Sequence, residues 1–313
     1  MSWDEESLAL LRCPASGERL HRVDSALVTA SGRNTYRIDP SEIPLFAERE
    51  CSAEGRTQQQ HYDRVAETYL ENLTFPHTQE YMRYLDDALL EQVGPGSLGT
   101  VAEVCCGRGE AFHLLGDRIR RGIGVDVSVG ILGAAARENS KATVSFVQGD
   151  ATRLPLTSQG FDNVIVLGGI HHVNDRRRMF GEIFRILKPG GRFFWREPVS
   201  DFLPWRAARA VVYRMSPALD RETEHPLLSA DTISRLTEAG FRLTSWTTHG
   251  FLGFCLLMNS DVLVFNRLFR FVPGIRGFTR LMTSVDRMTL ALPGMGRAGL
   301  QVVGVAEKPG AGR

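Results

Sequence analysis

The stretch VAEVCCGRGEAF, from Val101 to Phe112, contains residue types that can hold a nucleotide. Gly107 and Gly109 stand where an apolar strand should end and a helix should begin. Such a turn presents free backbone N–H groups, and small residues allow a ligand to approach them closely. The spacing argues against a dinucleotide site, because the third glycine of G-x-G-x-x-G falls on Phe112. It also excludes a Walker loop, because no Gly-Lys-Ser/Thr sequence follows.

The turn resembles motif I of the class I S-adenosylmethionine-dependent methyltransferases. The motif aligns on Glu103, Cys105, Gly107 and Gly109. Four later landmarks of the family follow in its order. The first two are Asp126 with Val127, which end GIGVDV, and the GDA segment of Gly149, Asp150 and Ala151. The last two are FDNVIVLGGIHHV, which contains Leu167 and Gly168, and LKPGG from Leu187 to Gly191. The resemblance covers about residues 58 to 250 and is closest to the branch of ubiquinone and menaquinone methyltransferases. It implies S-adenosylmethionine as the cofactor.

The resemblance also assigns contacts to individual residues. Asp126 would grip both ribose hydroxyls, since a carboxylate has two acceptor oxygens, and Asp150 would accept from the adenine amine. Tyr62 and Tyr69, in the helical segment QQQHYDRVAETYLE, would cover the pocket. Cys105 stands where the family usually has glycine. A positive φ would cost about 1 kcal/mol or more there, so we expect Cys105 to be extended and simply to pack.

Methyl transfer from a sulfonium is an in-line displacement, helped by positioning and sometimes by a base. The histidine pair after FDNVIVLGGI lies beside the donor methyl in the family, so His172 is the first choice for a base, followed by His171. Glu197, His225 and His249 are further candidates. The alternative is that the pair only shapes its loop.

The segment 251–297 is the one most able to decide the acceptor, because it is unusually apolar and carries several arginines. Residues 251–313 hold 7 arginines and 1 lysine against 3 acids, an excess of 5 positive charges that would steer an anionic acceptor. LPWRAARAVVYRM, from Leu203, is a second basic amphipathic stretch. Such segments form a lid over a hydrophobic substrate, lie on a membrane surface, or pack as an ordinary cap or in a homodimer.

From residue 61 onward, strand and helix patterns alternate, which predicts an α/β fold with a parallel sheet covered on both faces. The family implies a Rossmann-like sheet of seven strands whose last strand, LQVVGVAEK, forms an antiparallel edge hairpin. We expect helices in DRRRMFGEIFRILKPGG and in SADTISRLTEAGF, where Ser229 would be the N-cap. The expected methyltransferase domain is 51–313, with a helical insertion at about 251–297.

Residues 1–50 form the other expected unit, with short β-like pieces in ALVTASG, NTYRID and EIPLFAE. Its Cys13-Pro14 pair and the pattern around Tyr36, Ile38 and Ile43 resemble a Trm112-like zinc ribbon. The other ligand cysteines of that domain are missing, and a zinc site needs four ligands. We therefore predict a cap without metal.

The chain has 313 residues and a net charge of +1, so we expect no nucleic-acid partner. The five cysteines form no CxxC pair, the N-terminus has no secretory pattern and no apolar run would span a membrane, which together favour the cytoplasm. The sequence predicts methyl transfer to a small, hydrophobic or anionic acceptor. Two alternatives remain open: an rRNA or tRNA methyltransferase, and a cofactor-binding scaffold without catalysis.

Overall fold

The computed structural model describes residues 3–60, 73–139, 141, 143–207, 225–258 and 264–310. Its centre is a seven-stranded sheet with the strand order β6-β5-β4-β7-β8-β10-β9. The strands are β4 (Gly99–Val104), β5 (Ile119–Asp126), β6 (Val144–Gln148), β7 (Phe161–Leu167), β8 (Leu187–Pro198), β9 (Arg242–His249) and β10 (Gln301–Glu307). The expected Rossmann-like α/β fold with seven strands is confirmed.

The pairing of the strands places their ends. β6, β5, β4, β7 and β8 run parallel, so their carboxyl ends meet at one edge of the sheet. β10 is antiparallel to both β8 and β9, as expected for the last strand. However, β10 is not the outermost strand, because it lies between β8 and β9 and leaves β9 at the edge.

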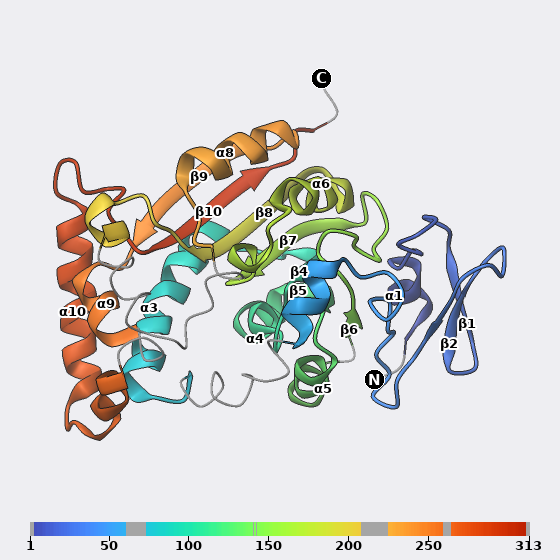
Figure 1. The fold of residues 1–313 in the computed structure, drawn as a ribbon, viewed down its shortest axis with the longest axis horizontal. Helices are drawn as coiled ribbons and strands as arrows, with labels where there is room; N and C mark the ends of the chain where they lie inside the picture. The colour runs from blue at the N-terminus through green and yellow to red at the C-terminus, as the bar shows by residue number, and fades with distance from the viewer. Residues whose placement is uncertain are drawn as a thin grey trace.

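Helices cover both faces of the sheet (Figure 1). Those on one face are α3 (Pro76–Val93), α4 (Glu110–Leu115) and α5 (Val129–Glu138), and those on the other are α6 (Arg176–Ile186) and α8 (Ser229–Glu238). Side chains alternate along β8, so that Phe193 and Trp195 join one core and Phe194 the other. The predicted N-cap of α8 was one residue late: Leu228 is the cap, and the N–H of Ser229 donates to Asp201 at 2.9 Å.

The N-terminal segment forms α1 (Glu5–Ala9) and an antiparallel sheet of β1 (Leu20–Val23), β2 (Ala26–Thr29) and β3 (Thr35–Arg37). Of the expected β-like pieces, EIPLFAE forms no strand of this sheet. It continues the large sheet instead: the Phe46 N–H donates to the Gln148 carbonyl at 3.1 Å, and the Gln148 N–H donates to the Pro44 carbonyl at 2.9 Å. The N-terminal segment is thereby joined to the edge strand β6.

The insertion between β9 and β10 is helical, as expected. It consists of α9 (Leu252–Met258), η3 (Val264–Phe271) and α10 (Ile275–Leu290), which we call the lid. The lid shares a small core with α3, made by Tyr81, Leu85, Leu257 and Ile275. Figure 1 places the lid and the N-terminal sheet at opposite ends of the long axis. Within the described ranges, no helix has the length and apolar character needed to cross a membrane.

Candidate functional site

The turn after β4 reverses the chain through residues with positive φ. Cys105, Gly107 and Gly109 have φ values of 53°, 51° and 78°, and Gly109 is the N-cap of α4. A Cβ at Gly109 would lie 3.1 Å from the Phe146 ring and 3.0 Å from the Asn139 side chain, so only glycine fits without a shift. A Cβ at Gly107 would meet no atom of the described residues within 4 Å.

Our expectation of an extended Cys105 was wrong, because this residue is left-handed. The sharp turn lets the Cys106 N–H donate to the Val125 carbonyl at 3.0 Å. The Cys105 side chain fits because the neighbouring loop has a glycine: a Cβ at Gly169 would lie 2.3 Å from the Cys105 Cβ. Burial raises the pKa of the Cys105 thiol well above its usual value, and the nearby carboxylates of Asp126, Glu197 and Asp150 raise it further. Cys105 therefore sits in a negative field.

Asp126 lies at the carboxyl end of β5 and fixes the turn. Its Oδ2 accepts the Gly107 N–H at 2.9 Å, and its Oδ1 accepts the Ser128 N–H at 3.0 Å, at the start of α5. The neighbouring Val127 carbonyl accepts from the Gln148 side chain at 3.1 Å. Asp126 is thus held beside the glycine turn, where β5 ends.

Asp150 follows the next strand and is buried. Its Oδ1 accepts from the N–H and hydroxyl of Thr152 at 2.8 and 2.7 Å, and its Oδ2 accepts from the Ser52 N–H at 2.8 Å. Burial alone would raise its pKa, but the hydrogen bonds from Ser52 and Thr152 lower the pKa of Asp150 below its usual value. It is therefore a buried carboxylate that stays ionised. Its neighbour Gly149 has no room for a side chain, since a Cβ would lie 2.9 Å from Pro155, and the adjoining Ala151 packs on the core.

Glu103 lies behind the turn, near the end of β4, and is 1% exposed. Its Oε1 accepts the Ala111 N–H in the first turn of α4 at 2.9 Å, whereas its Oε2 has no hydrogen-bond partner among the described residues. Burial raises the pKa of this carboxyl well above its usual range. A buried acceptor without a partner is costly, and a cationic or donating ligand group would relieve that cost.

Glu197, at the end of β8, organises the loop after β7. It is fully buried, and its carboxylate accepts the N–H groups of Gly169, Ile170 and His171 at 2.7, 2.8 and 3.3 Å. His171 Nδ1 lies 2.8 Å from the same carboxylate. These contacts join the end of β8 to the loop after β7 through the Glu197 carboxylate.

The structure brings the other predicted catalytic residues to this loop. The rings of His171 and His172 have centroids 3.8 Å apart, and the His225 N–H donates to the His171 carbonyl at 3.0 Å. Leu167 ends β7, and Gly168 follows it with a φ of 73° and no described atom within 4 Å of its Cβ position. His249 instead lies against α3, with Nδ1 3.2 Å from the Tyr84 hydroxyl.

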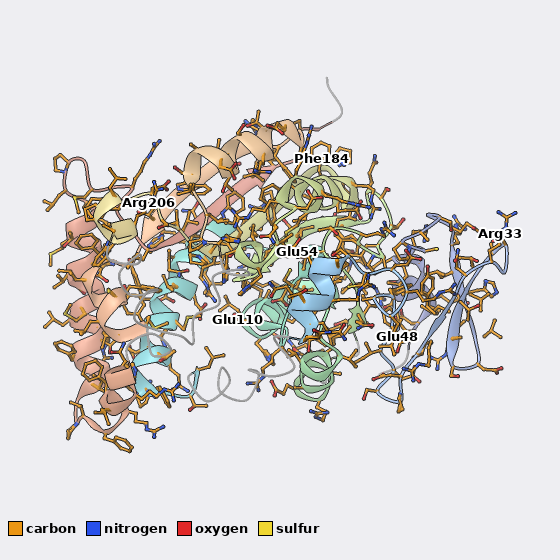
Figure 2. All side chains as sticks on the ribbon, in the orientation of Figure 1. Arg33, Glu48, Glu54, Glu110, Phe184 and Arg206 are labelled. Atoms are coloured by element: carbon orange, nitrogen blue, oxygen red, sulfur yellow. The ribbon has the colours of Figure 1, made fainter. Side chains whose placement is uncertain are left out.

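Two predicted residues, Tyr62 and Tyr69, lie outside the described residues. Just before them, the helical residues 53–60 cross the site. The Glu54 carboxylate accepts the Asn174 N–H at 2.5 Å, and a Cβ at Gly55 would lie 2.9 Å from Asp150 Oδ2. Figure 2 labels Glu54 and Glu110 in the central part of the molecule.

Sequence reasoning missed several residues of the site. Ser52 and Glu54 hold Asp150 and the loop after β7, and the buried Arg196 pairs with Asp86 and with Glu110 on α4. Each contact joins residues that are far apart in the chain and belong to no short motif. Among the described residues, no group of three or more His, Cys, Asp or Glu side chains is arranged to hold a metal ion.

Comparison with known proteins agrees with this geometry. Residues 102–195 match the family described as "Methyltransferase domain". The chain is similar to demethylmenaquinone methyltransferase of Lactococcus lactis subsp. lactis (strain IL1403), with 33% identity over 111 residues, which are 34% of this chain and 44% of the relative. It is also similar to the chloroplastic 2-phytyl-1,4-beta-naphthoquinone methyltransferase of Arabidopsis thaliana, with 31% identity over 151 residues, 45% of this chain and 56% of the relative. The chain thus spans about half the length of these relatives.

Among solved structures, the 4+2 cyclase SpnF superposes with a TM-score of 0.58 at 20% identity, covering 82% of this chain and 97% of the other. Likeness at this level shows a shared fold. The fold by itself therefore does not decide which reaction the site performs.

Proposed function

We propose that this chain, which carries a methyltransferase domain of the class I fold, is an enzyme that transfers a methyl group from S-adenosylmethionine to a small acceptor. One observation carries the proposal: the carboxylates of Asp126, Asp150 and Glu197 stand at the carboxyl ends of the parallel strands β5, β6 and β8, and Asp126 accepts the Gly107 N–H of the glycine turn. Ligands of open α/β sheets bind outside these strand ends. A negative field there suits a cation such as a sulfonium.

The residues present fit this cofactor. No described atom lies within 4 Å of the Cβ positions of Gly107 and Gly168, which suits a ligand against the backbone there, and Glu103 keeps a buried oxygen without a partner among the described residues. Asp126 would hold the ribose and Asp150 the adenine amine. When bound, the cofactor supplies an electrophilic methyl group on a positively charged sulfur.

The chain's own residues then position the acceptor and handle its proton. Glu197 fixes the backbone of Gly169 to His171 and holds His171 through its Nδ1. The adjoining His172 is our choice for the base that accepts a proton from the acceptor. The backbone of His225 is tied to the same loop through His171. Full turnover by His172→Ala would dismiss His172 as the base.

We further propose that the acceptor is hydrophobic or anionic, of the quinone, isoprenoid or lipid-like class. The similar proteins from Lactococcus and Arabidopsis are methyltransferases of a menaquinone precursor and a naphthoquinone, which supports this class. A nucleic-acid acceptor is not proposed, given the net charge of +1.

For residues 1–50 we propose a metal-free remnant of a Trm112-like domain. Its single cysteine, Cys13, has its Sγ 3.1 Å from the Tyr36 hydroxyl, and the Ser16 N–H donates to the same sulfur. The segment also buttresses the Asp150 loop, because Glu50 pairs with Arg153 at 2.6 Å. All five cysteines are free thiols, which supports a reducing, cytoplasmic location.

Calorimetry with S-adenosylmethionine and S-adenosylhomocysteine tests the proposal. We expect Asp126→Ala to weaken binding by about 1.5–3 kcal/mol, the usual loss of hydrogen bonds to a charged group. Asp117→Ala is the matched control, because Asp117 is 98% exposed and pairs only with Lys141 at the surface among the described residues. No binding of either compound would overturn the enzyme proposal. Binding without turnover on any quinone or lipid acceptor would favour a non-catalytic scaffold instead.

A further inference from the structure

Exposed apolar side chains are concentrated on the lid. Of the eleven large apolar side chains that are exposed in the described part of the chain, eight belong to it: Leu252, Leu268, Phe271, Val272, Phe278, Leu281, Met288 and Leu292. Scattered single apolar residues are normal on a protein surface, but a contiguous group marks an interaction site.

Four of these residues share one side of α10 and its C-terminal end. Phe278, Leu281, Met288 and Leu292 follow one another at intervals of three, seven and four residues, which keeps them on one helical face. Leu281 and Met288 are 59% and 63% exposed. Side chains project outward from the outer side of α10 in Figure 2.

We call this face, together with the exposed Phe271 at the end of η3, the apolar stripe. Phe271 is 70% exposed and precedes the start of α10 by only a few residues. The opposite side of α10 is buried, and its Asp286 is tied inward by Tyr81. The stripe therefore lies along the outside of the lid for about the length of α10, roughly 24 Å at 1.5 Å per residue.

Among the described residues, the exposed charged side chains beside the stripe are arginines. Exposed arginines flank it at positions 270, 276, 280 and 287. The only acidic residue in the sequence from 264 to 297 is Asp286, which is fully buried. Glu80 of α3 lies 3.6 Å from Arg276 and 3.8 Å from Arg280, but its side chain is 4% exposed. Among the described residues, the outer surface of the lid thus offers apolar groups and more positive than negative side chains.

The apolar stripe and its arginines suit a lipid bilayer better than a second copy of the chain. A second copy of the chain on the stripe would bring a second set of arginines and no exposed acid from the lid to neutralise them. A bilayer with anionic lipids supplies both an apolar layer for the stripe and negative headgroups for the arginines. We propose that the apolar stripe and its arginines form a docking surface for an anionic lipid bilayer. This inference does not rest on the proposed reaction.

Co-sedimentation with vesicles tests the proposal on the full chain. Phosphatidylcholine vesicles are compared with vesicles of phosphatidylcholine and phosphatidylglycerol in equal parts. We expect binding to the mixed vesicles that weakens as salt is added, since salt screens the arginines. The double variant Leu281→Glu, Met288→Glu should bind at least about tenfold more weakly. Changing Arg276, Arg280 and Arg287 to glutamine should weaken binding on the order of a hundredfold at low salt.

Val23→Glu is the matched control, because Val23 is an exposed apolar residue of β1 in the N-terminal sheet. It should bind vesicles like the unmodified chain. Equal binding of the Leu281/Met288 variant, or equal binding to both vesicle types, would overturn the proposal. So would a dimer in sedimentation velocity that disappears in the Leu281/Met288 variant while no vesicle binds, because the stripe would then be an interface between two copies.

Discussion

The carboxyl edge of the sheet and the lid handle charge in opposite ways. At the sheet edge, Asp126, Asp150 and Glu197 are carboxylates whose oxygens accept backbone N–H groups. On the lid, the arginines at positions 270, 276, 280 and 287 are exposed, and the one described acid, Asp286, is buried among donors. The sheet edge therefore concentrates negative charge around a turn, whereas the lid displays positive charge around an apolar surface.

The two regions owe their structure to different kinds of constraint. At the sheet edge, backbone geometry dictates the residue: Gly109 has no room for a Cβ, and Asp126 must stand where β5 ends. On the lid, contacts between distant elements decide: Asp286 joins α10 to α9 and to Tyr81 of α3. Variants in each region should therefore differ in how much stability they lose and where the chain first unfolds.

The largest effect should follow the loss of Glu197. Glu197→Ala leaves the N–H groups of Gly169, Ile170 and His171 without their buried acceptor. Each unsatisfied buried donor is costly, so we expect the free energy of unfolding to fall by about 3–5 kcal/mol. Urea unfolding followed by circular dichroism measures it. Glu238→Ala, at the exposed end of α8, is the control and should change little. A loss below about 1 kcal/mol would show that the sheet edge does not depend on this carboxylate.

Loss of Asp286 should cost less and act on the lid. Its Oδ1 accepts the Gly253 N–H at 2.8 Å, and its Oδ2 accepts the Phe254 N–H at 3.0 Å and the Tyr81 hydroxyl at 2.5 Å. We expect Asp286→Ala to lower the free energy of unfolding by about 2–3 kcal/mol and Tyr81→Phe by about 1 kcal/mol. Limited proteolysis should find new cleavage in α9 or α10 before any in the sheet. Cleavage that begins in the sheet would remove the distinction between the two regions.

The same contrast explains what could be predicted from the sequence. The sheet, the glycine turn and the acids at the ends of β5 and β6 follow from local patterns, so they were placed correctly. The helical insertion was also predicted. The hydrogen bond that holds it on α3 was not predicted, because its partners, Asp286 and Tyr81, are far apart in the chain. Glu197 was located correctly at the end of β8, yet its contacts with the loop after β7 depend on strand pairing. The left-handed Cys105 was missed because its partner, Gly169, belongs to another loop.

A third, pH-dependent effect is expected where the sheet meets α3. Burial lowers the pKa of His249 from 6.5 to about 4, so His249 stays neutral in the folded chain while the unfolded chain takes up a proton. Between pH 6.5 and about 4 the unfolded state binds more protons, so stability falls as the pH is lowered through this range. His249→Asn removes this titration. The difference in unfolding free energy between the two chains should shift in favour of the variant as the pH falls, and a constant difference would contradict the assignment.

The smallest effect distinguishes the two adjacent cysteines of the turn. Cys105 has a φ of 53°, whereas Cys106 has no positive φ and is 3% exposed. Cys105→Gly should relieve the cost of the left-handed conformation, about 1 kcal/mol or more, but adds chain entropy to the unfolded state. We expect a net gain of about 0.5 kcal/mol in the free energy of unfolding.

Two further variants decide whether backbone geometry is the cause. Cys105→Val should lose about 2 kcal/mol, because a β-branched side chain tolerates a positive φ poorly. Cys106→Ala should lose about 1 kcal/mol through packing alone. If Cys105→Gly lost stability as Cys106→Ala does, the Cys105 thiol would contribute more through its contacts than its conformation costs. The sheet edge would then depend on long-range packing in the same way as the lid.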